Sequence, residues 1–395
     1  MNEAIVFHRS ALAANMARQI LLSGTPSASG SGLFLAAPRR TGKSTFLRED
    51  LRPQLEAEGA LVLYVDLWAD RKANPGLAIV SAIRAELAKH EGVITRLARS
   101  AGMEKVNVGG VTFSLDRVGL GAQVSLSSAL AALSDEVKRT IVLIIDEAQH
   151  AITTEDGYDA LFALKAGRDE LNGSGHHGLR IVATGSNRDK LAMLRNSKDQ
   201  AFFGAPLVQF PALGADFIEW FCSRIQLPAP LSPPDVEKLF ARAAFRPEVI
   251  GAAADLLRFD FSLAAKDVPA RFAAAVDEQI QAGDAQMLRV VHGLTPLQSA
   301  VLRVMAARGA DFAPFEADTL AAYRQVLNAI APEERIEPDT SNVQQVLVAL
   351  QDKALIWRER RGVYALEEGT LADLLQSHGL LDMVSPPPAN LKVQG

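Results

Sequence analysis

The chain contains a single cysteine, Cys222, among its 395 residues. A disulfide within the chain needs two cysteines, so none is possible, and this scarcity of thiols is typical of a reducing compartment. The sequence also lacks any run of about 18 uncharged apolar residues, so we expect no membrane-spanning helix. Its first residues show no basic stretch followed by a long apolar run, so we expect no signal peptide. Together these absences favour a cytoplasmic protein.

The sequence has no excess of basic residues either. It carries 41 Lys and Arg against 46 Asp and Glu, a net charge of −5 at pH 7. A protein that coats nucleic acid or membranes by charge alone is therefore not expected, although a local basic face is compatible with this balance. The content of 48% hydrophobic and 22% charged residues is ordinary for a globular protein with a sizeable core. The length predicts two or three domains of roughly 100–200 residues each.

A phosphate-binding loop is predicted in residues 33–45, which read Leu-Phe-Leu-Ala-Ala-Pro-Arg-Arg-Thr-Gly-Lys-Ser-Thr. The apolar start predicts a buried strand, and the end predicts a helix from Lys43 onward. The loop between them fits the spacing Gly-x-x-x-x-Gly-Lys-Ser/Thr, with Ala37 in place of the first glycine. Successive N–H groups at a helix start form an anion site, and Gly42 lets that backbone approach phosphate closely. The segment therefore predicts a nucleotide site.

The residue types of this loop suit ATP with Mg²⁺. Lys43 can bridge the β- and γ-phosphates, and the hydroxyl of Ser44 can ligate the metal. The loop residues that we expect to bind the nucleotide are Pro38, Arg39, Arg40, Thr41, Gly42, Lys43, Ser44 and Thr45.

A second motif lies about a hundred residues downstream, in Ile141-Val-Leu-Ile-Ile-Asp-Glu-Ala-Gln149. Five apolar residues predict a fully buried parallel strand that ends in two carboxylates. Asp146 is placed to complete the Mg²⁺ site with Ser44, and Glu147 is placed to polarise an attacking water. Such a strand end is common by itself, but together with the phosphate loop it predicts ATP hydrolysis.

Further candidates lie outside the two motifs. Ser186 or Asn187, after another predicted strand, is placed to touch the γ-phosphate or align the water; an ordinary strand ending is the alternative. Arg246 precedes a predicted helix and is placed to reach the γ-phosphate, or to serve as a structural cap. Phe7 and Arg9 are candidates for walls of an adenine pocket, with packing of the first helix on the sheet as the alternative.

The chain divides into four predicted segments. Residues 1–212 form an α/β core with a β-hairpin insertion near 105–126, and residues 213–285 form a helical segment. Residues 286–371 show a capped helix with an apolar stripe, then two short strands, which is the order of a winged helix. Residues 372–395 are expected to be a flexible tail.

These features resemble the AAA+ ATPases, closest to the STAND and archaeal-type branch that includes relatives of origin-recognition proteins. The resemblance rests on residues 37–45, 141–149, 183–187 and 245–247 and on the order of core, lid and winged helix. It implies a five-stranded parallel sheet with the phosphate-loop strand central, ATP and Mg²⁺ as ligands, and nucleotide-controlled self-assembly. It also implies that Lys43 and Glu147 are catalytic and that Arg246 is the second sensor.

The resemblance has one marked departure. The stretch Ala201-Phe-Phe-Gly-Ala-Pro206 is similar to one that often reads Phe-Gly-Arg in relatives, and Ala205 stands in place of the arginine. Hydrolysis is therefore expected to be slow without a partner. Arg188 and Arg195 are the alternative candidates for an arginine that reaches a neighbouring subunit, against a plain surface role.

Three functions fit these observations. The first is an ATP-hydrolysing switch that acts on a partner protein. The second is a DNA-binding ATPase whose winged helix reads duplex DNA, because Asn342, Gln344 and Gln345 are base-reading types and Arg358, Arg360 and Arg361 suit phosphate. Residues 287–371 nevertheless carry nine basic and eleven acidic side chains, a net charge of −2. The third is a nucleotide-gated scaffold with little turnover.

Overall fold

The computed structural model describes residues 6–22, 28–70, 72–100, 118–120, 123–173, 175–196, 200–360, 362–367 and 369–384. The chain forms two compact units. The first comprises Met1–Ile225 with Ser232–Glu248, and the second comprises Gln226–Leu231 with Val249–Gly395. Within the described ranges, no helix is both long enough and apolar enough to cross a membrane.

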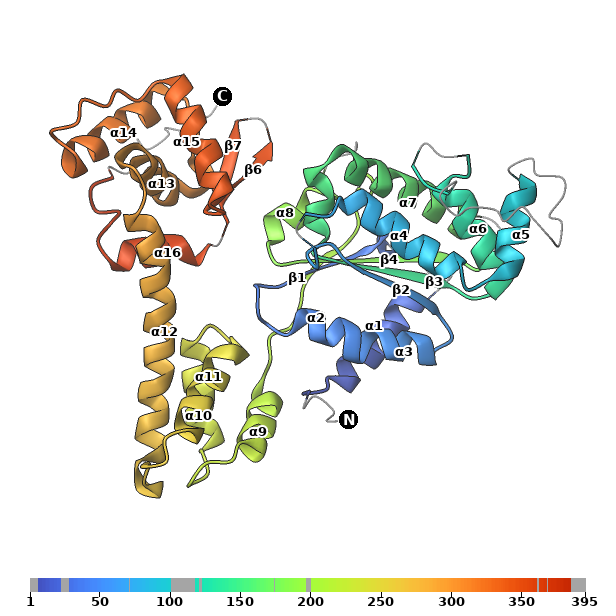
Figure 1. Cartoon of the computed structure of the whole chain (residues 1–395), viewed down its shortest axis with the longest axis horizontal. Coiled ribbons are helices and arrows are strands. Elements are labelled where there is room, and N and C mark those ends of the chain that lie inside the picture. Colours follow the sequence, from blue (N-terminus) through green and yellow to red (C-terminus); the bar gives the residue numbers. More distant parts are fainter. Residues whose placement is uncertain are drawn as a thin grey trace, which may run out of the picture. The chain divides into compact units, whose positions relative to one another are not determined.

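The first unit is built on a five-stranded parallel sheet (Figure 1). Its strands are β1 (Leu33–Ala36), β2 (Leu61–Asp66), β3 (Ile141–Asp146), β4 (Leu179–Gly185) and β5 (Leu207–Gln209). They lie in the order β2-β3-β4-β1-β5. The expected α/β class and five-stranded parallel sheet are confirmed. The central strand, however, is β4, and β1 lies between β4 and β5, because only the short β5 extends the sheet beyond it.

Apolar side chains of the strands alternate between two cores. Ile141, Leu143 and Ile145 of β3 belong to one core, and Val142 and Ile144 belong to the other. Every residue of β3 is buried, as expected for an internal strand of a sheet that is covered on both faces. This burial explains the continuous apolar run before the two carboxylates.

Helices cover both faces of the sheet (Figure 1). One face is covered by α1, α2, the π-helical turn η2 and α3, and the other mainly by α4, α5, α6 and α7. Their bounds are α1 (Ser10–Leu21), α2 (Lys43–Phe46), η2 (Leu47–Leu51), α3 (Arg52–Ala57), α4 (Pro75–Leu87), α5 (Glu91–Ser100), α6 (Leu126–Val137) and α7 (Glu155–Gly173). The 3₁₀ turns η1 (Ala28–Ser31) and η4 (Ala148–Thr153), then α8 (Arg188–Ala192), α9 (Ala215–Arg224) and α10 (Pro233–Arg242), complete this unit.

The second unit is helical with one small hairpin. Its elements are α11 (Pro247–Arg258, which begins at the boundary between the units), η5 (Ala265–Asp267), α12 (Val268–His292), α13 (Pro296–Arg308), η6 (Gly309–Asp311), α14 (Ala317–Ile330), α15 (Thr340–Asp352), β6 (Ile356–Arg360), β7 (Val363–Leu366) and α16 (Thr370–Ser377). The antiparallel pair β6–β7 follows α15 directly, which is the helix-then-hairpin order expected for a winged helix.

Two predicted boundaries differ from the structure. The single helix α12 runs 25 residues, across the boundary expected after residue 285, because no helix-breaking proline interrupts it. The first residues of the tail expected from residue 372 instead belong to α16, and Leu375 and Leu381 are buried in the core of the second unit. The hairpin expected near 105–126 falls largely outside the described residues.

Gly157, near the start of α7, packs so closely that its substitution tests the packing of the first unit. A Cβ on Gly157 would lie 1.9 Å from the backbone oxygen of Ala151, whereas a Cβ on Gly173, at the other end of α7, would meet nothing within 4 Å. We expect Gly157→Ala to lower the free energy of unfolding by about 1–3 kcal/mol, because backbone atoms must shift to make room. Gly173→Ala is the matched control and should change stability by less than about 1 kcal/mol. Thermal unfolding followed by circular dichroism measures both, and equal effects would contradict the packing argument.

Candidate active site

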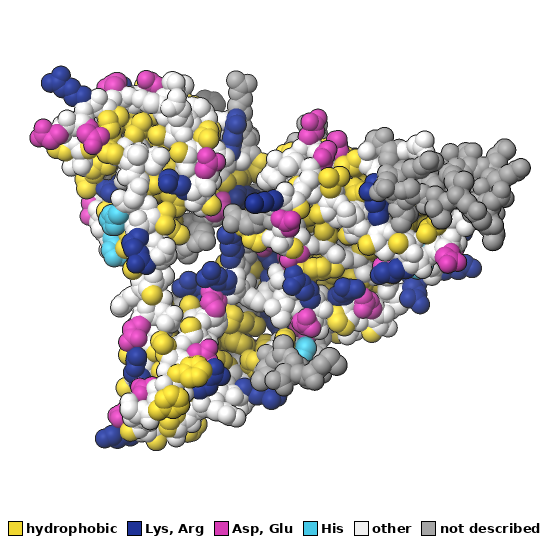
Figure 2. All heavy atoms as spheres, viewed as in Figure 1, with side chains coloured by type: hydrophobic (Ala, Val, Ile, Leu, Met, Phe, Trp, Pro, Cys, Tyr) yellow, Lys and Arg dark blue, Asp and Glu magenta, His cyan; other side chains and the backbone are white. Residues whose placement is uncertain are grey.

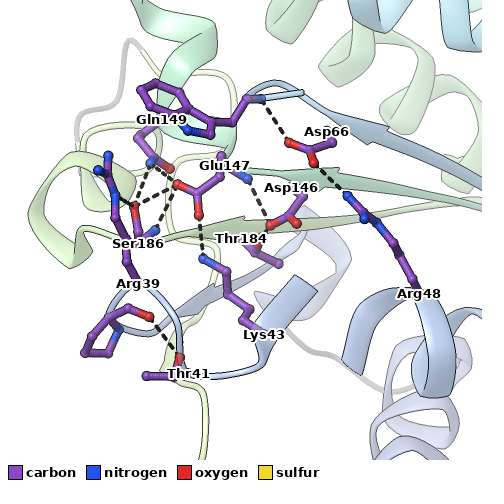
Figure 3. Close-up of polar contacts among 12 residues, drawn as sticks. Arg39, Thr41, Lys43, Arg48, Asp66, Asp146, Glu147, Gln149, Thr184 and Ser186 are labelled. Carbon is purple, nitrogen blue, oxygen red and sulfur yellow. Dashed lines mark hydrogen bonds and ion pairs between the residues drawn. The ribbon is translucent and has the colours of Figure 1, made fainter. Parts of the chain in front are cut away.

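The loop between β1 and α2 has the backbone of a phosphate cradle. Arg40 and Gly42 have φ of 62° and 80°, in the left-handed region. Left-handed residues inside such a loop help to turn successive N–H groups toward one side, where they can bind an anion. The hydroxyl of Thr41 donates to the carbonyl of Pro38 at 2.8 Å and closes the loop (Figure 3). Ala37 is buried and does not have a positive φ, so this position does not require the glycine usual in the motif.

An ion pair joins the phosphate loop to the end of β3. Lys43 is the first residue of α2, and only 5% of it is exposed. Its Nζ donates to Oε1 of Glu147 at 2.9 Å (Figure 3). Strands β1 and β3 lie on either side of β4, so their carboxyl ends are about 10 Å apart, a span that the two side chains bridge. The two sequence motifs therefore meet at one place.

Two more side chains hold the carboxylate of Glu147. Its Oε2 accepts from Oγ of Ser186 at 2.8 Å and from Nε2 of Gln149 at 2.5 Å. Burial would raise the pKa of this carboxyl, but the charge of Lys43 and the hydrogen bonds from Lys43, Ser186 and Gln149 outweigh it and lower the pKa to about 2. Glu147 is therefore an oriented anion at neutral pH.

The backbone at Glu147 is unusual for a residue with a Cβ. Its φ is 54°, in the left-handed region, directly after the last residue of β3. Such a conformation carries strain that the surrounding contacts must overcome, and it is found often at active sites. Gly185 supports the arrangement from β4, because a Cβ there would lie 2.5 Å from Oε1 of Gln149.

Asp146 is completely buried beside this cluster. Its Oδ1 accepts from the hydroxyl of Thr184 and, at 3.1 Å, from the N–H of Glu147. Its Oδ2 accepts from the hydroxyl of Tyr64 at 3.0 Å. Burial, together with the charge of Asp146, raises the pKa of the Tyr64 phenol well above its usual range.

The residues expected to hold Mg²⁺ are chemically suited to it. Ser44, half-buried in the first turn of α2, offers a hydroxyl, and Asp146 offers a carboxylate. Mg²⁺ prefers oxygen ligands and typically uses one or two protein groups together with substrate phosphates. The described residues contain no cluster of three or more His, Cys, Asp or Glu that could cage a metal.

Comparisons with known proteins bear on the fold. No protein-family model matches the chain, and no curated protein sequence matches it. Among solved structures, a Walker-type ATPase of Pyrococcus abyssi is similar over 94% of this chain and 96% of its own, with 14% identity and a TM-score of 0.51. The ORC2 protein of Aeropyrum pernix in its ADP form is similar over 98% of both chains, with 14% identity and a TM-score of 0.53. This chain has an AAA+ P-loop fold.

The same ORC2 protein in ADPNP–ADP complexes covers 96% of this chain and 98% of its own, with 16% identity and a TM-score of 0.50. At identities this low, the likeness establishes the fold of the AAA+ core and its attached domains, and the chemistry rests on this chain's own residues.

The two candidate residues that follow β4, Ser186 and Asn187, have different contacts in the structure. Ser186 joins the cluster around Glu147, with further contacts at 3.4 Å from Arg39 and Gln149. The side-chain oxygen of Asn187 instead accepts the N–H groups of residues 189 and 190 at 3.0 Å, so it caps α8. Ser186 therefore contacts the predicted catalytic carboxylate, whereas Asn187 has a capping role.

The remaining candidates have local structural partners. The Nε of Arg246 donates to the carbonyl of Ala243 at 3.0 Å, within the turn between α10 and α11. The ring of Phe7 packs on Phe217, with ring centroids 5.4 Å apart. Arg9 donates to the backbone carbonyls of residues 211 and 212 at 2.8 and 3.2 Å. These contacts favour the packing alternatives, in which Phe7 and Arg9 fix the N-terminal segment of the AAA+ core.

Sequence reasoning assigned no role to Gln149, Tyr64 or Arg48, although the structure places all three in the network of the two carboxylates. Gln149 follows Glu147 by only two residues, so its position in the sequence could have indicated that it lies near the carboxylate. Tyr64 and Arg48 are distant from Asp146 in the sequence, and no local pattern identifies them. Arg39, expected at the phosphate, lies over the ring of Trp68 at 5.2 Å.

The low pKa of Glu147 predicts a pH dependence of stability. A carboxyl whose pKa falls from 4.5 to about 2 on folding stabilises the folded chain above pH 4.5. This contribution is lost as the pH falls from about 4.5 toward 2. We expect wild-type chain to lose more stability between pH 6 and pH 3 than Glu147→Gln, as measured by thermal unfolding. Glu155→Gln, at the exposed start of α7, should follow the wild-type curve, and identical curves for all three would contradict the assignment.

Proposed function

We propose that this chain is an ATP-binding, Mg²⁺-dependent ATPase that works as a nucleotide-controlled switch. The observation that carries the proposal is the contact between Lys43, at the start of the helix after the phosphate loop, and Glu147, at the end of β3. A cation at the phosphate loop and an oriented carboxylate beside it are two of the groups that hydrolysis of a phosphoanhydride requires of the protein. The ADP and ADPNP complexes of the ORC2 protein, whose fold this chain shares, agree with a nucleotide ligand.

Each residue has a distinct role in the proposed reaction. The N–H groups of the loop and the ammonium of Lys43 bind phosphate oxygens. Ser44 and Asp146 would hold Mg²⁺, which supplies charge neutralisation at the phosphates when bound. Glu147 orients a water and accepts its proton as general base. Because Lys43 pairs with Glu147, a bound phosphate competes for the same ammonium, and ATP binding and the orientation of Glu147 are coupled.

The switch is proposed to act on a partner protein or on a second copy of this chain. The basis is Ala205, which removes the arginine that relatives often carry at this position, so that turnover depends on a group supplied from outside. Arg188 and Arg195 remain proposals for such a group acting on a neighbouring copy, and Arg246 remains a proposal for a sensor of the γ-phosphate. Acidic and basic side chains are interspersed on the visible face of the protein (Figure 2), which argues against binding by charge alone.

Two substitutions test the proposed chemistry. Lys43→Ala should weaken ATP binding at least about 30-fold, because loss of a buried charged contact costs roughly 2 kcal/mol or more. Glu147→Gln should bind ATP at least as tightly as wild type, because the carboxylate that competes for Lys43 loses its charge, but should lower kcat by about 100-fold or more, because a general base typically contributes that much. Fluorescent-nucleotide titration and steady-state phosphate release measure the two effects.

The exposed Lys89→Ala and Glu155→Gln variants serve as controls and should behave as wild type. Tight ATP binding by Lys43→Ala would refute the phosphate-loop assignment. Unchanged turnover in Glu147→Gln would remove Glu147 from the mechanism.

A second candidate function, binding of duplex DNA, is favoured by a groove in the second unit. The groove has a volume of about 600 Å³ and lies between the start of α15 and the hairpin β6–β7. Its lining residues are mainly polar, as groove-reading surfaces are: Phe315, Thr340, Ser341, Gln344, Gln345, Arg358 and Gly362. Arg358 is exposed and lies over the ring of Tyr364 at 5.9 Å.

One residue of this candidate interface has local structural partners. The side chain of Asn342 forms a capping box with Asp339 at the start of α15, and its amide also donates to the carbonyl of Glu337 at 2.6 Å. These contacts occupy the amide oxygen and one amide hydrogen that would read a base, so they favour a structural role for Asn342 as the third residue of the capping box. Arg361 and the side chain of Arg360 lie outside the described part of the chain. Gln345 and Arg358 carry the proposal.

Salt dependence tests this candidate. If Arg358 contacts a phosphate, Arg358→Ala should weaken duplex DNA binding uniformly across sequences and reduce the slope of log K against log salt concentration by about 1. Gln345→Ala should change sequence preference and leave that slope unaltered. Fluorescence anisotropy between low and physiological salt measures both. Wild-type chain that shows no DNA affinity with ATP, or an Arg358→Ala slope equal to wild type, would contradict a DNA contact at this groove.

A further inference from the structure

We propose that Tyr64, held by Arg48, is a positioning residue that sets the Mg²⁺-binding carboxylate of Asp146. This inference rests on the proposed function, since it concerns the same metal site. Tyr64 lies in the middle of β2 and Arg48 lies in the π-helical turn η2, so neither belongs to the two nucleotide-binding motifs. π-Helical turns of this kind are frequent at functional sites.

The direction of each hydrogen bond in this network is fixed by chemistry. The Nε of Arg48 lies 3.0 Å from the hydroxyl oxygen of Tyr64 and, because a guanidinium only donates, that oxygen must accept. The phenol has one proton, and its other polar neighbour is Oδ2 of Asp146 at 3.0 Å. Tyr64 therefore donates that proton to the carboxylate.

Arg48 is itself held in place. Its Nη2 donates to Oδ2 of Asp66 at 2.7 Å, and Oδ1 of Asp66 accepts the N–H of Trp68 at 2.9 Å (Figure 3). The guanidinium also lies over the Tyr64 ring, 5.2 Å from its centroid. The guanidinium of the half-exposed Arg48 thus has hydrogen bonds to both Tyr64 and Asp66, and these favour the orientation in which its Nε donates to the phenol.

The count of acceptor sites on Asp146 shows what this orientation controls. A carboxylate has about four acceptor sites, two on each oxygen. Oδ1 accepts two hydrogen bonds, from the hydroxyl of Thr184 and the N–H of Glu147, whereas Oδ2 accepts one, from Tyr64. The remaining acceptor site is therefore on Oδ2, the oxygen to which Tyr64 donates. Tyr64 thus sets the direction of the site that is left for the metal or its water.

A phenylalanine at position 64 would keep the ring that packs with the core on the α1–α3 face of the sheet and remove only the hydroxyl. Tyr64→Phe is therefore the sharpest variant, and Tyr158→Phe on α7 is the matched control. Removal of a group that orients a metal ligand typically costs 10- to 100-fold in metal affinity or activity. We expect Tyr64→Phe to raise the Mg²⁺ concentration for half-maximal ATPase at least about tenfold.

A second readout does not depend on turnover. With ADP present, Mn²⁺ binding followed by electron paramagnetic resonance should weaken by a similar factor in Tyr64→Phe. ADP affinity in EDTA should stay within about twofold of wild type, and Tyr158→Phe should match wild type in every assay. A thermal shift in Tyr64→Phe without any change in metal dependence would show a purely structural role and overturn the inference.

Arg48→Gln provides a variant that leaves the phenol in place. If Arg48 acts through Tyr64, its effect on Mn²⁺ affinity should be smaller than that of Tyr64→Phe, and the double variant should be no worse than Tyr64→Phe alone. Effects that multiply would overturn the proposed chain of action. If the wild-type chain binds no Mn²⁺ in the presence of ADP, both the proposed function and this inference are overturned. If the wild-type chain binds Mn²⁺ and Tyr64→Phe binds it equally well, only this inference is overturned.

Discussion

The ion pair between Lys43 and Glu147 is the interaction on which the organisation of the first unit depends. Both side chains are largely buried, 5% and 15% exposed, and burial of either charge alone would be costly. The pair forms only if β1 and β3 end at the same edge of the sheet, one on each side of β4. The sheet order therefore acts as the frame that brings an ammonium and a carboxylate from distant segments to one place.

The contacts around this pair extend outward from β3 in two directions. Toward β4, Ser186 and Gln149 hold the carboxylate of Glu147, and Gly185 leaves room for the glutamine. Toward β2, Tyr64 and its partner arginine hold the neighbouring carboxylate of Asp146. The adjacent carboxylates of Asp146 and Glu147 thus have separate sets of side-chain hydrogen-bond partners. This separation fits the different roles proposed for them, in metal binding and in water activation.

The second unit illustrates how a polar residue can be committed to structure even where its type suggests recognition. In α15, the side chain of Asn342 accepts the N–H of the N-cap residue Asp339, whereas Gln345 remains exposed beside the groove. The same distinction separates Asn187, which caps α8, from Ser186. In both cases a short polar side chain near a helix start satisfies backbone N–H groups first, because those groups have no partner within the helix.

The sequence by itself determined the phosphate loop, the buried strand β3 and its two carboxylates, because these patterns depend on residues adjacent along the chain. It also predicted the helix and the hairpin that correspond to α15 and β6–β7 of the second unit. Only the tertiary structure decided which of the polar residues after β4 contacts Glu147, and which tyrosine faces Asp146. Those choices depend on strand order and on competition between hydrogen-bond partners, and neither is encoded in any short stretch of sequence.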